Sequence, residues 1–454
     1  MTSQLMEIIQ LDSKVQELFV EVEKAVTLKV LVLIGFKLGL AIALVIVKEI
    51  LIDRAHRIID QPLCPKCQAS LHSKGWLPRT VKTLIGILRW KRQVWRCPNG
   101  CKIGQVAPFD IELGLRPNQR TGDEVKQIAC ALAVFIPFNI AVVLLKTLTG
   151  IEVSSEAIWD WVQCAGKEAM SKLEAELAAL KDKLPDAEQI EAKIAQLPLL
   201  IGGDGVMVPF RPNEGNPEGK TVWQEVKVGI LTRLGKRITG KGKEVSVTVR
   251  RRMVAVLGNI DAFKSRMWLA SVKEGILEAV TVVWISDGGR GFWGVFHDLF
   301  SKKAQGILDF YHAAQNIWKG AKPWFDGRTK KAHEWFASAR HLLRAGKVKE
   351  VLDEMKYALK SQCLADSVQK TLKNVIFYLE THIDHISYDR YKELGLPIGS
   401  GMVESACKWL IQQRFKCVGM RWSEDGFNNL LHLRLAWVNG NFDILFEPPA
   451  SPNL

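Results

Sequence analysis

Residues 197–210 read LPLLIGGDGVMVPF, and residues 279–289 read AVTVVWISDGG. Each is an apolar run that leads into an acid, Asp204 in the first and Asp287 in the second. Short apolar runs bounded by glycine are typical of buried strands. We therefore expect each acid to end a buried strand. The glycine after each acid would let a phosphate backbone approach closely.

The segments around these two runs predict one domain. WQEVKVGILTRL (223–234) and KEVSVTVRRRMVAVLG (243–258) indicate a second and a third strand. Helices are then expected at 260–278 and 290–302, before a fifth, short strand within AQGILDFYH (304–312). Consecutive strands followed by alternating helices and strands predict a mixed sheet with helices on its faces.

The rest of this half is predicted to be helical. Residues 312–392 have a helical pattern, and the glycine-rich loop GLPIGSG (395–401) leads into a helix at 402–417. Glu404 would lie one turn into that helix. Taken singly, Asp204 or Asp287 fits a loop acid that opens a turn, and Glu404 fits a favourable first-turn acid that pairs with Lys408.

Four cysteines form two close pairs, CPKC (64–67) and CPNGC (97–101), separated by 29 residues. A short loop between paired cysteines aims both sulfurs at one ion, and zinc prefers four such thiolates. The segment between the pairs is rich in Val, Ile, Trp and Arg, which indicates a hairpin. We expect a zinc ribbon with ligands Cys64, Cys67, Cys97 and Cys101. Basic side chains of the hairpin could contact phosphates or could form a solvated face: Arg79, Lys82, Arg89, Lys91, Arg92 and Arg96.

The first 166 residues contain further helical segments. Residues 1–58 look helical, and their apolar run 30–47 is interrupted by Lys37. A spanning helix needs about 20 apolar residues, so we expect a buried or self-associating helix, with a membrane helix as the alternative, and a cytoplasmic protein without a membrane partner. Residues 119–166 resemble a helix-turn-helix whose reader, 155–165, presents Trp159, Asp160 and Gln163. A helical connector or dimerisation bundle is the alternative. Residues 167–193 predict a charged helical hairpin or a short coiled coil that acts as a spacer.

The composition is that of a globular, basic protein. Of 454 residues, 48% are hydrophobic and 24% charged, which makes extensive disorder unlikely. The net charge of +14 favours a polyanionic partner, either nucleic acid or an anionic surface. Nine cysteines, five of them scattered, fit a reducing compartment better than a disulfide framework.

Six motifs occur in one order: GGDGVMVP, WQEVKVGI, WISDGG, ILDFYHAAQNIW, GLPIGSGMVESACK and GMRW. Over residues 60–445 the chain resembles the Kra-type insertion-sequence transposases of the Mutator-related group. The resemblance implies a ribonuclease-H-like catalytic domain with a helical insertion. It also implies a catalytic triad of Asp204, Asp287 and Glu404 that holds two Mg²⁺ or Mn²⁺ ions.

The resemblance extends to accessory residues. Asp309 and His312 form its Asp-x-x-His, which would order the active site or contact flanking DNA, although His312 could also be a buried core residue. Many transposases with three catalytic acids have Lys or Arg seven positions after the Glu, but this sequence has Ile411 there. Lys408 or Arg414 is therefore the candidate for the phosphate contact. Further DNA contacts are expected from Lys416, Arg421 and Trp422, with a core position as the alternative for the tryptophan.

The sequence therefore predicts a DNA transposase that binds terminal inverted repeats and target DNA and acts as a homodimer or higher oligomer. A metal-dependent nuclease or resolvase of the same fold is one alternative, and a non-catalytic zinc-ribbon DNA-binding protein is another. The fold class is multidomain α+β. Seven segments are expected: 1–60 helical, 61–118 zinc ribbon, 119–166 helix-turn-helix-like, 167–197 spacer, 198–311 catalytic, 312–395 helical insertion and 396–454 catalytic with a C-terminal helix.

Overall fold

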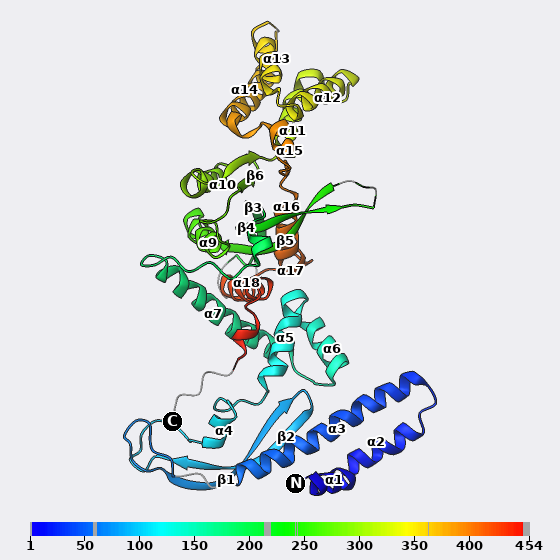
Figure 1. Cartoon of the computed structure of the whole chain (residues 1–454), viewed down its shortest axis with the longest axis vertical. Coiled ribbons are helices and arrows are strands. Elements are labelled where there is room, and N and C mark those ends of the chain that lie inside the picture. Colours follow the sequence, from blue (N-terminus) through cyan, green and yellow to red (C-terminus); the bar gives the residue numbers. More distant parts are fainter. Residues whose placement is uncertain are drawn as a thin grey trace. The chain divides into compact units, whose positions relative to one another are not determined.

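The computed structural model describes residues 2–57, 61–212, 219–240, 242, 244–361 and 363–447. The chain forms two compact units (Figure 1). The N-terminal unit is Met1–Val162 together with Asp443–Leu454. The other unit is Gln163–Phe442, and we call it the catalytic unit after the role that the sequence predicts for it. The expected last segment, 396–454, is thus divided, because the chain after Phe442 belongs to the N-terminal unit.

The N-terminal unit begins with three helices, α1 (Thr2–Leu11), α2 (Ser13–Glu23) and α3 (Leu28–Ala55). Asp12 starts α2 by accepting hydrogen bonds from the Lys14 and Val15 amides, and Thr27 starts α3 by accepting one from the Val30 amide. These caps satisfy amides that have no partner inside a helix.

Helix α3 is only partly buried. Its described buried residues are Val45, Leu51 and Ala55, whereas Val30 and Phe36 are 42% and 56% exposed. The expectation of a buried helix is therefore wrong for its first half, and self-association stays a prediction. By length and composition alone, α3 could also cross a membrane.

The cysteine-bounded hairpin is formed by β1 (His72–Thr83) and β2 (Gly86–Arg96), which pair antiparallel. Val81, Leu88 and Trp90 on one face of it pack with the end of α3 and with Phe109 of the short helix α4 (Pro108–Glu112). Alternate residues of a strand point to one face, so these apolar positions give the hairpin a buried side.

Three helices follow, as expected: α5 (Asp123–Phe135), α6 (Phe138–Thr149) and α7 (Ser155–Ala179). Their breaks fall at Ile136-Pro137 and at Gly150, whose positive φ of 74° ends α6. Near the other end of the chain, the one-turn helix η4 (Asp443–Leu445) joins this unit, where Gln127 donates a hydrogen bond of 2.7 Å to Asp443.

The expected spacer hairpin does not form. Helix α7 continues from the N-terminal unit into the catalytic unit and ends at Ala179, and no helix is assigned from there until α8 (Ala192–Ala195). The intervening chain lies against the catalytic unit instead, where the Glu188 amide donates to the Lys273 carbonyl at 2.9 Å. Pro185 and an ion-paired Glu188 favour this extended course over a second helix.

The catalytic unit is built on a five-stranded mixed sheet. Strands β3 (Leu199–Phe210), β4 (Val222–Ile238) and β5 (Glu244–Leu257) are consecutive and antiparallel. Strands β6 (Val282–Ser286) and β7 (Gln305–Leu308) are parallel to β3, so the order is β5-β4-β3-β6-β7. The mixed sheet predicted from the sequence is confirmed.

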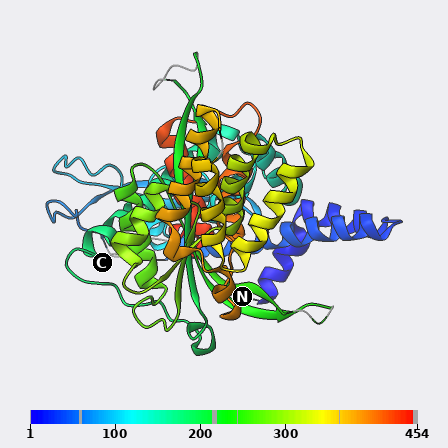
Figure 2. The same ribbon diagram turned by 90° about the horizontal axis from the view of Figure 1, so that it is seen from above.

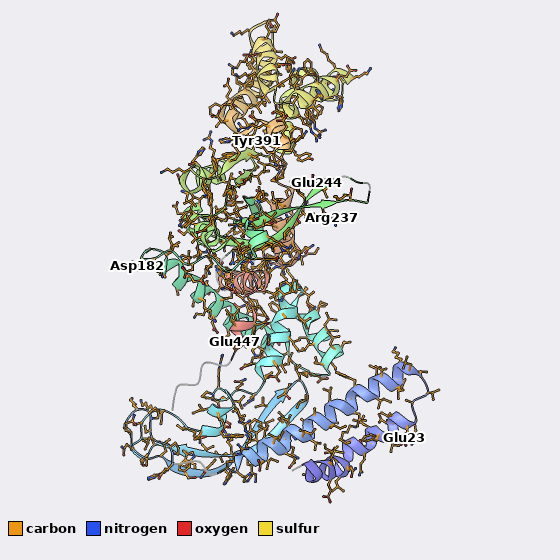
Figure 3. All side chains as sticks on the ribbon, viewed as in Figure 1. Glu23, Asp182, Arg237, Glu244, Tyr391 and Glu447 are labelled. Carbon is orange, nitrogen blue, oxygen red and sulfur yellow. The ribbon has the colours of Figure 1, made fainter. Side chains whose placement is uncertain are left out.

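Beyond the sheet, β4 and β5 continue as a two-stranded arm that projects from the unit (Figures 1 and 2). Arg237 and Glu244 lie near its end (Figure 3). Because most residues of β5 in this arm are not buried, the arm contributes surface rather than core.

Helices cover the sheet on both faces. Glycines mark the close approaches: a Cβ on Gly203 would meet the rings of Phe292 and Phe263 at 2.9 and 3.2 Å, on α10 (Arg290–Val295) and α9 (Ile260–Lys273). A Cβ on Gly202 would meet Val403 at 2.6 Å, on α16 (Gly401–Ala406). Since strand residues alternate between faces, Asp204 lies on the same face as Gly202 and α16.

The remaining helices complete the unit. Helix α10 continues as the π-helix η1 (Phe296–Phe300), and α16 continues as the π-helix η3 (Cys407–Gln412), then α17 (Gln413–Phe415) and α18 (Glu424–Val438). The helical insertion comprises α11 (Phe310–Phe325), α12 (Lys330–Arg344), α13 (Val348–Ser361), α14 (Asp366–Thr381), η2 (Ile383–His385) and α15 (Tyr388–Glu393).

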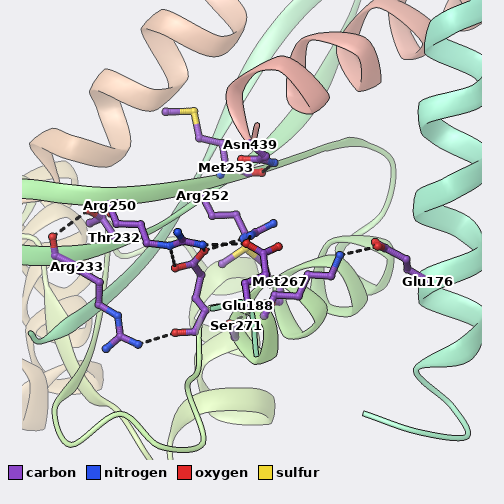
Figure 4. Close-up of polar contacts among 12 residues, drawn as sticks. Glu176, Glu188, Thr232, Arg233, Arg250, Arg252, Met253, Met267, Ser271 and Asn439 are labelled. Carbon is purple, nitrogen blue, oxygen red and sulfur yellow. Dashed lines mark hydrogen bonds and ion pairs between the residues drawn. The ribbon is translucent and has the colours of Figure 1, made fainter. Parts of the chain in front are cut away.

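A buried ion cluster ties the beginning of the sheet to α9 (Figure 4). Glu274, only 2% exposed, accepts from Arg250 and Arg252 at 2.9 Å each, and Glu188 pairs with the same two arginines. Arg233 is also buried and donates to the carbonyls of residues 195, 197 and 274. Buried charges need such partners, so this cluster has a structural role at the end of the sheet away from Asp287.

Candidate active site and metal centre

The four paired cysteines converge as expected. Their sulfur atoms lie within 4.8 Å of one another, with Cys67 and Cys97 at 3.5 Å. Four thiolates around a zinc ion with bonds of about 2.3 Å would be separated by about 3.8 Å. The cluster is therefore compatible with a structural zinc site.

The turns that carry the cysteines explain this convergence. Cys64 lies in a tight turn in which its carbonyl accepts from the Gln68 amide at 2.9 Å, and Gln68 has a positive φ. Cys97 directly follows β2, and Gly100 next to Cys101 also has a positive φ. The hairpin thus brings two distant turns to one end, as two zinc knuckles require.

Two arginines of the hairpin share one structural partner. The guanidinium groups of Arg79 and Arg92 lie 3.7 and 3.2 Å from Asp110, and their side chains are about one-tenth exposed. Both arginines hold α4 against the hairpin. They also line a cavity of about 620 Å³ together with Lys82 and Arg120, so positive charge does gather there.

The expected reader helix presents a different surface from the one predicted. Trp159 packs edge-on against Phe138 with ring centroids 5.4 Å apart, and Gln163 accepts a hydrogen bond of 2.8 Å from Asn429. Two of the three side chains expected to face DNA are thus engaged within the protein. Ser154 caps this helix by accepting from the Ala157 amide at 3.2 Å.

Asp204 lies in the middle of β3, not at its end as the sequence suggested. The strand continues to Phe210 because β4 pairs with it along its whole length, Asp204 opposite Val228. Burial raises the pKa of Asp204, and the negative charges of Asp287 and Glu404 raise it further, against the lowering effects of the Gly205 amide and His312. Asp204 therefore lies close enough to Asp287, Glu404 and His312 to be affected by their charges.

Asp287 directly follows β6, as expected, and its loop is held in place on several sides. Its carboxylate accepts from the Gly289 amide at 3.0 Å, and its carbonyl accepts from Trp293 Nε1 at 2.7 Å. A Cβ on Gly288 would lie 2.0 Å from the ring of Tyr378 on α14. The helical insertion thus packs directly on the loop that carries the acid.

Tyr378 was not foreseen from the sequence. Burial, followed by the charge of Asp287, raises the pKa of Tyr378, so its hydroxyl stays neutral. A lone tyrosine in a helical segment has no motif around it, and only its packing on Gly288 identifies it.

Asp309 connects to Glu404 through a chain of hydrogen bonds. Its side chain is 1% exposed and caps α11. Asp309 Oδ1 accepts from the His312 amide at 2.7 Å, and Oδ2 accepts from the Ser400 amide. The Ser400 carbonyl then accepts from the Glu404 amide at 3.1 Å. Asp309 therefore links the end of β7 to the first turn of the helix that carries Glu404.

The charges of Asp309 and His312 are matched. Burial raises the pKa of Asp309, but hydrogen bonds from His312 and from the Ser400 amide outweigh burial and lower this pKa to about 2. His312 Nδ1 lies 3.2 Å from the Asp309 carboxylate, which raises the pKa of the histidine, as do the more distant Asp287 and Asp204. His312 is half-buried and faces the acids, so it is not the fully buried core residue that the sequence left open.

The acidic site is more open than the cysteine site. Among the residues that the structure describes, only the four cysteines bring three or more ligand atoms within 4.8 Å. Burial is the main cause of the raised pKa of Asp204, and the negative charges of Asp287 and Glu404 add to it. A divalent cation bound by carboxylate oxygens would relieve that charge, so the donor set suits Mg²⁺ or Mn²⁺.

The expected DNA contacts after Glu404 divide into two groups. Lys408, Lys416 and Arg421 are exposed. Arg414 is 0% exposed, with its guanidinium 5.4 Å from the ring of Trp422, and Trp422 is itself 7% exposed. The expectation is wrong for Arg414 and Trp422, because both are buried.

Each of these side chains has a local partner. Lys408 lies 3.6 Å from Glu404, the ion pair that the spacing allowed, and Lys416 lies over the ring of Trp223. Trp422 donates from Nε1 to the Phe415 carbonyl at 3.0 Å and fills the core beside Phe415, as its alternative reading foresaw.

Comparison with known proteins yields little. No family model matches the chain, and no curated protein matches its sequence. Among solved structures it is similar to the Drosophila P element transposase strand transfer complex, with 11% identity over 74% of this chain and 83% of that one. The TM-score is 0.26, so this likeness is distant.

Proposed function

We propose that this protein is a DNA transposase of the Asp-Asp-Glu kind, which cuts the ends of a mobile DNA segment and joins them to target DNA. Asp204, Asp287 and Glu404 are the proposed ligands of two Mg²⁺ or Mn²⁺ ions. Such ions, when bound, activate the attacking oxygen and stabilise the leaving oxygen of a phosphodiester.

The observation that carries the proposal is that the fold brings together three acids from distant parts of the chain, because β3 and β6 are neighbouring strands and α16 packs on the face of β3 that carries Asp204. Asp204 comes from the centre of a strand, Asp287 from a strand end and Glu404 from a helix beyond the insertion. Burial and the two other acids together raise the pKa of Asp204. Folding gathers like charges at a cost unless a cation neutralises them, and that is how metal-dependent nucleic-acid enzymes use carboxylates.

The neighbouring residues have proposed positioning roles. Asp309 orients the turn that begins at Ser400 and so aims Glu404, and His312 balances the charge of Asp309. Lys408, Lys416 and Arg421 are exposed and are the proposed phosphate contacts on this side of the site.

The finer features of the proposal follow the motif resemblance. The mixed sheet and the helical insertion support a ribonuclease-H-like catalytic domain of the Kra type, although neither is specific to it. The cysteine cluster supports a zinc-bearing module that takes part in recognising terminal repeats. Assembly as a homodimer or higher oligomer on DNA, in the cytoplasm and without a membrane partner, belongs to the same proposal.

The test uses the full chain and labelled DNA fragments that carry the segments flanking its coding sequence, with a supercoiled plasmid as target. In Mg²⁺ or Mn²⁺, cleavage and joining are expected. Asp204→Asn, Asp287→Asn and Glu404→Gln should each abolish both steps with unchanged DNA affinity. Asp298→Asn, whose side chain is 55% exposed on η1, is the matched control.

Each other result has a definite meaning. Cleavage without joining would support a metal-dependent nuclease or resolvase instead. DNA binding without metal-dependent cleavage would support a non-catalytic zinc-ribbon protein. Full activity in any of the three acid variants would remove that residue from the site.

A further inference from the structure

A cavity beside Glu404 has no part in the chemistry proposed above. It has a volume of about 660 Å³ and lies where α11 meets α12 of the helical insertion. Proteins bind compact organic groups in cavities of roughly 300–1,000 Å³. Its lining includes Tyr311, Gln315, Trp318, Phe336, Arg340 and Glu404.

The walls of the cavity are aromatic and held in place. The ring of Trp318 packs between Phe336 and His333, with centroids 5.1 and 5.0 Å away. Tyr311 is 62% exposed, and a Cβ on Gly399 would lie 2.7 Å from its ring. Several aromatic rings on one cavity wall suit a flat, apolar group, since stacking uses ring faces regardless of sequence.

The polar groups of the cavity suit a nucleotide. Arg340 is exposed at the rim and brings positive charge, and Gln315 is an exposed amide that can both donate and accept. His312 also lines the cavity, and its raised pKa favours the charged form. Aromatic faces, an amide and two cations match a base with its phosphate better than they match a purely apolar ligand.

The position of the cavity restricts which nucleotide it can hold. Glu404 belongs both to the cavity lining and to the proposed metal site. A group bound in the cavity would therefore lie next to a DNA phosphate bound at that metal site. A base inside a duplex is stacked and cannot enter such a cavity unless it leaves its neighbours. Only an unpaired or extruded base fits these requirements.

We propose that the cavity binds an unpaired nucleobase of the strand being cut, adjacent to the scissile phosphate, with Trp318 as the stacking surface. This inference rests on the proposed function, because it requires a DNA strand at the three acids. Binding of the base in the cavity holds the strand at a fixed distance from the metal site. Trp318 and Tyr311 are therefore positioning residues rather than catalytic ones.

The test measures binding of the full chain, in Ca²⁺, to two DNA probes of equal length. One is a blunt duplex, and the other is a fork with three unpaired nucleotides, the middle one 2-aminopurine, whose fluorescence falls on stacking. Wild-type protein should bind the fork more tightly and quench its fluorescence. Trp318→Ala should abolish the quenching and weaken fork binding about 10-fold, with duplex affinity unchanged.

Two further variants keep the result interpretable. Tyr357→Ala removes an aromatic that is 69% exposed on α13 of the same insertion and outside the cavity, so it should behave as wild type. Because Trp318 packs between helices, Tyr311→Ala provides a second test at an exposed ring and should also reduce quenching. Its melting temperature should match that of wild type.

Equal binding of fork and duplex by wild-type protein would overturn the inference, as would unchanged quenching in Trp318→Ala and Tyr311→Ala. If wild-type protein still cleaves and joins DNA in Mg²⁺, only the cavity assignment fails. If it binds neither probe and cleaves no DNA, the proposed function fails with it.

Discussion

Replacing Asp309 by asparagine should destabilise the catalytic unit and displace Glu404. The two carboxylate oxygens of Asp309 accept from two different amides, those of His312 and Ser400. Asparagine has one oxygen and one NH₂ group, so one buried amide would face a donor. The variant also lacks the charge that pairs with His312.

The pKa of Asp309 sets the size of the effect. Its fall from 3.8 to about 2 means that the folded protein favours the charged carboxylate over the neutral one. That preference corresponds to about 2–3 kcal/mol, and asparagine imitates the neutral form. For a unit as long as Gln163–Phe442, this loss lowers the melting temperature by about 4 °C.

The effect has a defined pH dependence. Because the pKa of Asp309 is lowered on folding, its stabilisation is complete above about pH 4 and disappears as the pH falls towards 2. Thermal unfolding of wild type and Asp309→Asn should therefore differ at pH 7 and converge below pH 4.

Cleavage measured at 20 °C, where both proteins are folded, should fall at least about 10-fold in the variant, because the turn that carries Glu404 loses its anchor. Asp261→Asn, at a first-turn acid of α9 whose side chain is 77% exposed, is the control and should change neither property. A variant that melts within 1 °C of wild type at pH 7 would refute this account of Asp309.

Three further predictions concern the rest of the molecule. One zinc per chain is expected by elemental analysis, and Cys64→Ser should release it, whereas Cys130→Ser, at a buried cysteine outside the cluster, should retain it. Glu274→Gln should lower the free energy of unfolding by about 3 kcal/mol, since two arginines lose their buried partner, while the exposed Glu278→Gln should have little effect in the same urea titration. Trp422→Ala should cost about 3–5 kcal/mol in that titration, because the side chain is core; a variant of wild-type stability that has lost only joining activity would restore its role in stacking on DNA.

The sequence by itself determined the elements and the cysteine cluster. Apolar runs with β-branched residues, such as those leading to Asp204 and Asp287, predicted the strands because burial on both faces of a sheet demands them. The four cysteines of the cluster could be predicted as metal ligands because each pair is close in the sequence, and a short loop aims both sulfurs at one ion. The composition of the segment between the two pairs indicates the hairpin. The covering helices were likewise visible from their periodicity.

Other features depended on partners that are distant along the chain. The length of β3 beyond Asp204 follows from its pairing with β4, and the failure of the spacer hairpin follows from the ion pairs of Glu188 with Arg250 and Arg252. Hydrogen bonding and charge pairing across such separations leave no local pattern, so local propensity assigned a strand end and a helix wrongly.

The acidic site shows the same division. The motifs named its three acids, but only the tertiary structure shows that Asp309 holds the turn before Glu404 and that Tyr378 packs against Gly288. The sequence predicts a DNA contact for Arg414 and leaves both a DNA contact and a core position open for Trp422, since arginine and tryptophan are common in such contacts. Both are buried in the structure, because whether a side chain faces solvent depends on what packs over it, and the strand that pairs with Trp422 through Phe210 comes from a distant part of the chain.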